Sequence, residues 1–142
     1  MQDRFIYTLG TDLRSAEDFI EILLACEIRA VIDVRSFPVS RMSHFSKALL
    51  SELLISNGIA YHFFGKELGG FRKGGYAAYI TTKEFLNGVG MIEAVAETAV
   101  SVIICSEKLP WKCHRKWISR ELQHRGWSVG HIIDKDKVWK PK

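Results

Sequence analysis

The feature that most constrains the fold of this chain is a regular alternation of strand-like and helix-like segments. Short apolar stretches rich in β-forming residues occur five times, and segments with apolar residues at helical spacing separate them. The connections between successive strands are long enough for right-handed crossovers. The alternation therefore predicts a single three-layer α/β domain, with a mostly parallel sheet of about five strands and helices on both faces.

Five segments are predicted to be strands, namely residues 5–9, 30–34, 59–64, 100–105 and 128–133. Four helices follow from the apolar spacing: one after an N-cap at Ser15, one over Leu49–Leu54, one over residues 81–98 and one around Trp117–Leu122. Gly88 and Gly90 weaken the third helix early, so that the sequence allows a break there. Residues 65–80 contain five glycines and are predicted to form a long loop, of a length typical of functional or mobile segments. We assign residues 1–134 to the domain and residues 135–142 to a basic C-terminal tail.

Length and composition limit the class of protein. With 142 residues, 47% of them hydrophobic and 25% charged, the chain fits one globular domain and neither a disordered nor a coiled-coil protein. No apolar run approaches the roughly 20 residues that span a bilayer, and the first ten residues lack the features of a secretory signal. Because the chain also has three cysteines, an odd number, we expect a cytoplasmic protein with reduced thiols. The glycine motifs of dinucleotide and phosphate-loop sites are absent, so we expect no cofactor.

The positive charge is concentrated in the C-terminal part of the chain. The net charge is +4, and the segment from Lys112 to Lys142 contains nine basic and three acidic residues. Such a region is suited to nucleic acid or another polyanion. A solvated helix face followed by a basic tail is the more common origin of such a charge distribution, and charge alone does not decide between the two.

The richest chemistry follows the strand over residues 100–105. In open parallel sheets the functional crevice lies beyond the carboxyl ends of the strands, where Cys105 is expected. We place Cys113 in the first turn of the next helix, where unpaired amides bind anions and lower the pKa of a thiol. His114 and Arg115 strengthen both effects if they face the crevice. This segment predicts an anion pocket with Cys113 as a thiolate nucleophile, Glu107 as an acid or base, and Cys105, His114 and Arg115 as binding residues.

Other interpretations of the two cysteines remain open. Both cysteines are also compatible with a purely structural role, or with a reversible disulfide. Zinc would need Cys105, Cys113 and His114 with Glu107 or His44 as a fourth ligand, but the spacing does not match the short ligand pairs of structural zinc sites. We therefore predict no metal.

Further candidates follow the second and third strands. Asp33 and Arg35 share one face of a strand, so they either pair or line the crevice together. Arg35 and Arg41 offer guanidinium groups that match phosphate or carboxylate oxygens. Asp33 and His44 are the remaining acid or base candidates. Two cations of the glycine-rich loop, Lys66 and Arg72, are placed to close over a ligand or to remain solvated.

The order of these motifs resembles the domain of unknown function 488 family. The resemblance covers nearly the whole chain and rests on Tyr7-Thr-Leu-Gly10, Val31-Ile-Asp-Val-Arg35 with Pro38 and Arg41, Leu68-Gly-Gly70, Cys105-Ser-Glu107 and Cys113-His-Arg115. It departs at Thr11, where many relatives carry His or Tyr. The resemblance implies a small bacterial or archaeal α/β protein with these motifs gathered into one site, and it implies no activity.

Two functions from different classes follow. The leading hypothesis is a site for a phosphate, nucleotide or nucleic-acid ligand, belonging to a thiol-dependent hydrolase or transferase. The alternative is a non-catalytic module that binds nucleic acid or protein through the basic C-terminal region, chiefly Arg120, Arg125, Lys135 and Lys137. No membrane partner is expected, and the sequence does not indicate an oligomeric state.

Overall fold

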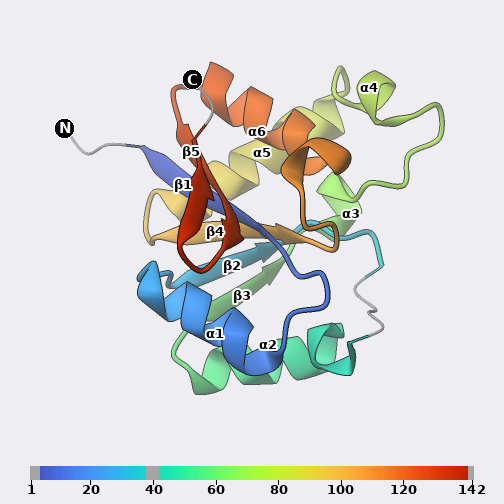
Figure 1. Ribbon diagram of the computed structural model, residues 1–142. Coiled ribbons are helices and arrows are strands. Elements are labelled where there is room, and N and C mark those ends of the chain that lie inside the picture. Colours follow the sequence, from blue (N-terminus) through green and yellow to red (C-terminus); the bar gives the residue numbers. More distant parts are fainter. Residues whose placement is uncertain (1–3, 38–41, 141–142) are drawn as a thin grey trace.

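A mostly parallel sheet forms the centre of the computed structural model, which describes residues 4–37 and 42–140 (Figure 1). Within these residues the sheet has six strands in the order β3-β2-β4-β1-β5-β6. They are β1 (Phe5–Gly10), β2 (Ala30–Asp33), β3 (Ala60–Phe63), β4 (Ser101–Cys105), β5 (Ser128–Asp134) and β6 (Lys137–Trp139). The first five strands are parallel, and β6 pairs antiparallel with β5.

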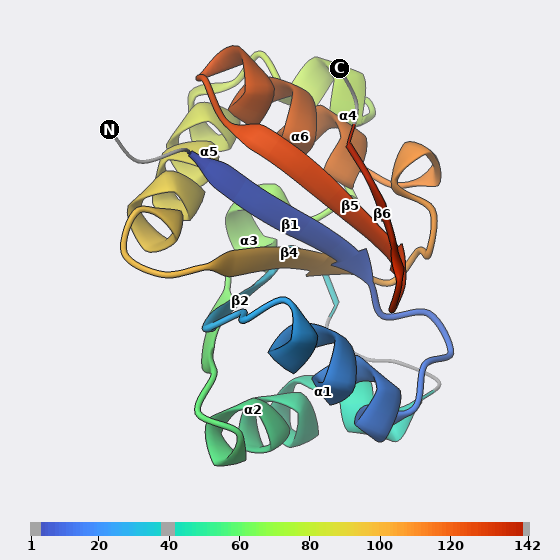
Figure 2. The ribbon, with the colours of Figure 1, turned by 60° about the vertical axis from the view of Figure 1, so that its left-hand side comes forward.

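Helices cover both faces of the sheet, as Figure 2 shows. In the described part of the chain the helices are α1 (Ala16–Ala25), α2 (Lys47–Ser56), α3 (Gly65–Leu68), α4 (Tyr76–Tyr79), α5 (Lys83–Ala96) and α6 (Arg115–His124). The first two pack on one face, and the other four contribute to the core on the opposite face. The predicted three-layer α/β fold is therefore confirmed. None of the described helices has the length and apolar character needed to cross a membrane.

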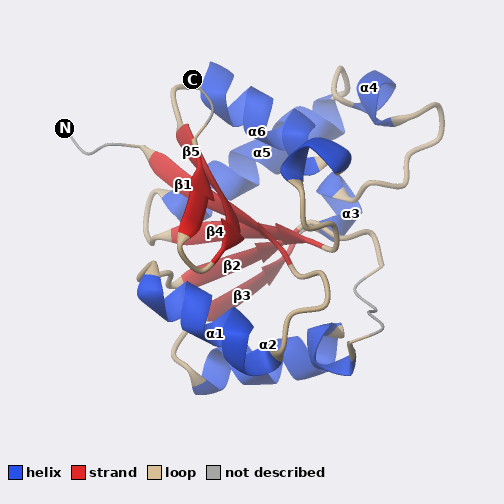
Figure 3. Ribbon diagram, viewed as in Figure 1, coloured by secondary structure: helices blue, strands red, loops and turns tan. Residues whose placement is uncertain are grey.

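The central strand β4 explains the two hydrophobic cores and the position of Cys105. All five of its residues are buried, because helices cover the sheet on both sides (Figure 3). Val102 and Ile104 face the core under α1 and α2, whereas Ile103 and Cys105 face the core under α5 and α6. The alternation thus brings the Cys105 side chain to the same layer as α6.

Local signals set the helix boundaries. The Ser15 hydroxyl accepts a hydrogen bond from the Asp18 amide at 3.0 Å, which confirms the predicted N-cap of α1. Helix α5 begins later than expected, because Thr82 caps it through the Phe85 amide at 3.2 Å. It runs unbroken through Gly88, so the break that the sequence allows does not occur. A Cβ at Gly88 would lie 2.8 Å from the Leu68 side chain, so this glycine allows α3 to pack closely on α5.

Two segments have more structure than the sequence indicates. The predicted loop of residues 65–80 contains the short helices α3 and α4. The segment assigned to a basic tail contains β6, so the sheet formed by the described residues has six strands where about five are predicted. Trp139 of β6 stacks on His131 of β5, with the ring centroids 5.3 Å apart. This contact helps to hold a strand whose three residues are too few to show an alternating pattern.

Candidate functional site

A pocket lies at the carboxyl edge of the sheet, where the sequence places the functional crevice. Its volume is about 600 Å³, which is within the usual size of small-ligand sites. The wall is formed by residues 35–37, 70–71, 105–107, 111–114 and 116–117, together with Tyr76 of α4. Both candidate cysteines and His114 therefore line one pocket.

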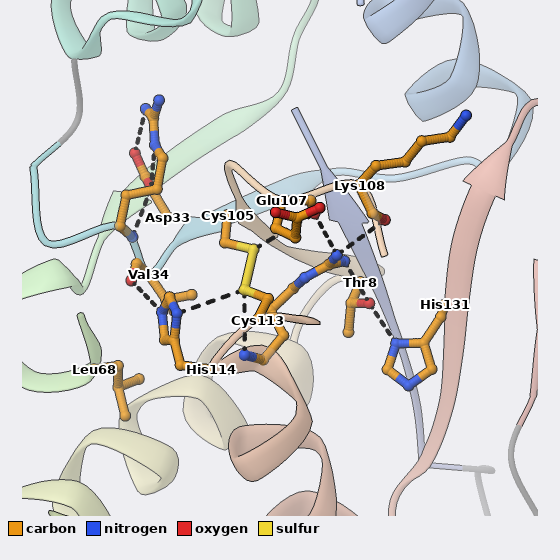
Figure 4. The surroundings of a disulfide bond; sticks show 12 residues. Thr8, Asp33, Val34, Leu68, Cys105, Glu107, Lys108, Cys113, His114 and His131 are labelled. Carbon is orange, nitrogen blue, oxygen red and sulfur yellow. Dashed lines mark hydrogen bonds and ion pairs between the residues drawn. A yellow bond between two sulfur atoms is a disulfide. The ribbon is translucent and has the colours of Figure 1, made fainter. Parts of the chain in front are cut away.

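Cys105 and Cys113 are joined by a disulfide in the wall of this pocket (Figure 4). Cys105 is buried at the end of β4, whereas Cys113 is partly exposed. The intervening loop contains a 3₁₀ turn, η2 (Pro110–Lys112), and turns back so that the second cysteine faces the first. The structure therefore differs from the expectation of reduced thiols, because the loop brings these two sulfur atoms together. Cys26 is a free thiol on the opposite side of the sheet.

The start of α6 faces the Cys113 sulfur. The predicted position in the first helical turn is wrong by two residues, since His114 is the N-cap and Cys113 precedes it. The Arg115 amide nevertheless donates to Cys113 Sγ at 3.5 Å. The unpaired amides of a helix N-terminus stabilise negative charge, so a reduced Cys113 would have its thiolate favoured at this position.

His114 lies between Cys113 and strand β2. Its Nε2 is 2.8 Å from the Val34 carbonyl oxygen, and its Nδ1 is 3.5 Å from Cys113 Sγ. Because a carbonyl oxygen only accepts, Nε2 carries the proton and the neutral ring has its lone pair on Nδ1, facing the sulfur. Burial lowers the pKa of His114, and the charges of Arg115 and Arg72 lower it further. The ring is therefore neutral at pH 7, with a proton acceptor directed at Cys113.

Arg115 lies behind the pocket wall, where it braces the loop. Its Nη1 donates to Thr8 Oγ1 at 3.0 Å, and its Nη2 donates to the Glu107 and Lys108 carbonyl oxygens at 2.7 and 3.2 Å. The side chain is fully buried, and its Nε has no hydrogen-bond partner among the described residues. Burial lowers the pKa of Arg115 to about 10, so the guanidinium remains charged at neutral pH. Arg115 contributes a buried positive charge to the site without reaching into the pocket.

Thr8 links this arginine to His131, a buried histidine of β5. Since the Thr8 hydroxyl accepts from Arg115, its own proton is available to His131 Nδ1 at 2.6 Å. Burial, together with the charge of Arg115, lowers the pKa of His131 to about 4. Sequence reasoning missed both residues. The signal available was one threonine and one histidine, each within an otherwise apolar strand.

Asp33 and Arg35 pair with each other on the other face of the sheet edge. The Arg35 Nε and Nη2 donate to the two Asp33 carboxylate oxygens at 2.9 and 2.8 Å, and the Tyr61 hydroxyl donates to the same carboxylate at 2.6 Å. Both charged side chains are buried. The alternation of β2 directs Val34 toward His114 and Asp33 toward α2. Arg35 also lines the pocket, so the cluster borders the site, but the Asp33 carboxylate is occupied by its partners.

The remaining candidates are distributed more widely. Glu107 is exposed in the pocket wall. His44 lies in the 3₁₀ turn η1 (Ser43–Phe45), where its Nε2 is 2.7 Å from the Arg14 carbonyl oxygen in a separate hollow beside α2.

Arg72 donates to the Gly69 and Lys66 carbonyl oxygens at 2.9 and 2.8 Å, and Lys66 is exposed on α3. Arg41 lies outside the described residues. The structure thus brings Glu107, but neither His44, Lys66 nor Arg72, into the pocket with Cys113.

Two of the four basic residues assigned to the alternative function are paired. Arg125 donates to Glu121 and Glu93, both at 2.7 Å, and Lys135 pairs with Glu21. Arg120 and Lys137 are exposed. Within the described ranges, no group of three or more His, Cys, Asp and Glu side chains is placed to hold a metal ion.

Comparison with protein families identifies the chain. The family model described as "Domain of unknown function DUF488" matches residues 15–75 and 71–122. The chain belongs to the DUF488 family. The comparisons with curated proteins and with solved structures find no match.

Two glycines, Gly10 and Gly70, permit close contacts around the site. A Cβ at Gly10 would lie 2.0 Å from the Glu107 carbonyl oxygen, and a Cβ at Gly70 would lie 2.9 Å from His114 Nδ1. Glycine thus lets β1 approach residues 106–112, the cysteine loop between Cys105 and Cys113, and lets residues 69–71 pack on the His114 ring. In this DUF488 chain the first-strand motif and the Leu68-Gly-Gly70 motif therefore support Cys113 and His114 indirectly.

Proposed function

We propose that the pocket is the active site of a thiol-dependent hydrolase or transferase that acts on a phosphorylated substrate, with Cys113 as the nucleophile. The observation that carries the proposal is the position of Cys113 Sγ, 3.5 Å from both His114 Nδ1 and the Arg115 amide. A nucleophile, a base and a third group that orients the base is the arrangement of activated thiol enzymes. Here the Val34 carbonyl is the orienting group.

The proposed reaction begins with reduction of the disulfide. A thiol reductant supplies two electrons and two protons, becomes a disulfide itself, and leaves Cys105 and Cys113 as thiols. His114 Nδ1 then takes the proton of Cys113, and the thiolate is stabilised by the first amides of α6 and by the buried charge of Arg115. Lys112 and Lys116 in the pocket wall are placed to attract the phosphate.

The chemical steps then balance as two displacements. The Cys113 thiolate forms a bond to phosphorus as the bond to the leaving oxygen breaks, and that oxygen takes the proton from His114. An acceptor hydroxyl, from water in a hydrolase or from an alcohol in a transferase, next attacks the phosphorus while Nδ1 takes its proton. The sulfur–phosphorus bond breaks and Cys113 returns as the thiolate. Glu107 in the pocket wall is the second candidate for proton transfer.

The experiment is the pH dependence of cysteine alkylation by iodoacetamide in reduced Cys105→Ser protein, followed by mass spectrometry with and without inorganic phosphate. Cys26 is a control thiol in the same molecule, since burial raises its pKa. We expect Cys113 to react at pH 7 about tenfold faster than Cys26, phosphate to protect Cys113 alone, and His114→Gln to remove the advantage. A Cys113 that titrates near the free-thiol value of about 8.5 and is indifferent to phosphate contradicts the proposal.

The alternative function, a binding module that uses the basic C-terminal region, has less support. Arg125 and Lys135 already neutralise acidic side chains of this chain. Binding of polyanions by this region would therefore rest on the exposed Arg120, Lys137 and Lys140. A salt-dependent affinity for single-stranded DNA that is lost in an Arg120→Ala, Lys137→Ala variant, with Cys113 intact, would favour it.

A further inference from the structure

Three aromatic side chains of the pocket wall are exposed to solvent. The exposed fractions of Phe37, Phe71 and Trp111, which we call the aromatic rim, are 68%, 78% and 51%. The rings of Phe37 and Phe71 contact each other, with their centroids 5.4 Å apart. A group of exposed aromatic rings at one pocket is unusual, because each exposes apolar surface that a ligand or partner would bury. The rim therefore indicates a ligand with a flat, apolar part.

Cationic and polar groups occupy the rest of the same pocket. Lys112 ends the 3₁₀ turn η2, and Lys116 lies in the first turn of α6. Both line the pocket. Ser36, Ser106 and Glu107 add hydroxyl and carboxylate groups that suit the hydroxyls of a sugar. An aliphatic lipid chain would leave these groups without partners. The expected ligand thus combines a flat ring, a polyhydroxyl part and a negative charge.

We propose that the pocket binds a nucleoside monophosphate, with the base against the aromatic rim and the phosphate at Lys112 and the start of α6. This inference rests on the proposed function, because it places the phosphate beside Cys113. Aromatic side chains beside cationic ones are the usual combination for stacking a base while holding its phosphate. A pocket of about 600 Å³ has room for one nucleotide.

The test is isothermal titration calorimetry of the reduced full chain with AMP, ribose 5-phosphate and phenyl phosphate. Ribose 5-phosphate keeps the sugar and the charge but lacks the base, and phenyl phosphate keeps a ring and the charge but lacks the sugar. We expect AMP to bind about tenfold more tightly than either. Phe71→Leu and Trp111→Leu are expected to weaken AMP several-fold and to leave ribose 5-phosphate unchanged. Ile55→Ala, an exposed apolar change on α2, is the matched control.

The outcomes separate this inference from the proposed function. Equal affinities for AMP and ribose 5-phosphate, or AMP affinity that is unchanged in Phe71→Leu, overturn the nucleotide assignment, even when phosphate still protects Cys113. Phenyl phosphate that binds as tightly as AMP overturns it as well, because a ring and a charge would then suffice. Tight, rim-dependent binding of AMP with an unreactive Cys113 supports the nucleotide site and removes the thiol chemistry.

Discussion

His114 is held between the Val34 carbonyl and the Cys113 sulfur, and Gly70 leaves the space that its ring occupies. We predict that Gly70→Ala displaces the ring, because the added Cβ would lie 2.9 Å from Nδ1, and that alkylation of reduced Cys113 slows several-fold at pH 7. Gly90→Ala on α5 is the control, since a Cβ there would have its nearest neighbour at 3.9 Å. The control should gain up to about 1 kcal/mol of stability. Unchanged alkylation in Gly70→Ala would remove His114 from the role of base.

His131 makes stability depend on pH. Its pKa is lowered to about 4 in the folded state, compared with about 6.5 in the unfolded chain, so the unfolded state binds more protons between these values. The contribution of His131 to the unfolding free energy is therefore fully present above about pH 6.5. It is lost as the pH falls toward 4, by up to about 3 kcal/mol. Urea titrations of wild type and His131→Asn across this range measure the difference, and we expect the variant to have the shallower slope. Identical slopes would show that His131 is not buried in its neutral form.

At the scale of elements, Arg115 connects β1, the cysteine loop and α6. Arg115→Ala would leave the Thr8 hydroxyl and two loop carbonyl oxygens without this partner, together with a cavity behind the pocket. We predict a loss of about 2–5 kcal/mol of unfolding free energy and faster proteolysis within residues 106–112. Arg120→Ala on the same helix is exposed and should change stability by less than about 0.5 kcal/mol. Equal stabilities of the two variants would contradict the bracing role.

The elements also show what the sequence could and could not predict. The spacing of apolar residues predicted β1 to β5 and the four long helices, because each of these elements buries apolar side chains at its own regular spacing. It missed β6, which is short and exposed, and it misplaced the start of α5, where two adjacent threonines compete as caps. For the site, strand ends placed Cys105, Cys113 and Arg35 at one edge. The packing of the helices decides on which face of the sheet a residue at that edge lies. The sequence therefore could not predict that His44 lies in a different hollow from Cys113.

On the scale of the whole molecule, a cluster at the amino edge of the sheet joins β1, α5, α6 and β5. Glu93 of α5 accepts hydrogen bonds from Arg4, Arg125 and the Trp127 indole at 2.7–2.9 Å. Although burial raises the pKa of Glu93, these donors outweigh it and lower the pKa. The carboxylate therefore stabilises the fold above its unfolded pKa of about 4.5, and this contribution is lost as the pH falls below that value.

We predict that Glu93→Ala lowers the unfolding free energy by about 2–4 kcal/mol, because it leaves two guanidinium groups and an indole without this partner. Thermal unfolding at pH 7 measures the loss. Alkylation of reduced Cys113 in the folded variant should stay at the wild-type rate, since the cluster and the pocket lie at opposite edges of the sheet. Glu97→Ala, which removes only an exposed partner of Arg4, is the control. A slower Cys113 in folded Glu93→Ala would show that the two edges are coupled.

The parallel strands give the molecule two unlike ends. Their amino ends gather the ion pairs that hold β1 to the helices, and their carboxyl ends gather the sulfur, imidazole and aromatic groups. The loops after β2, β3 and β4 can therefore change to accept a different ligand. Such changes leave the ion pairs at the amino ends of the strands intact. Chains built on this plan are free to diversify in chemistry without giving up the contacts that keep them folded.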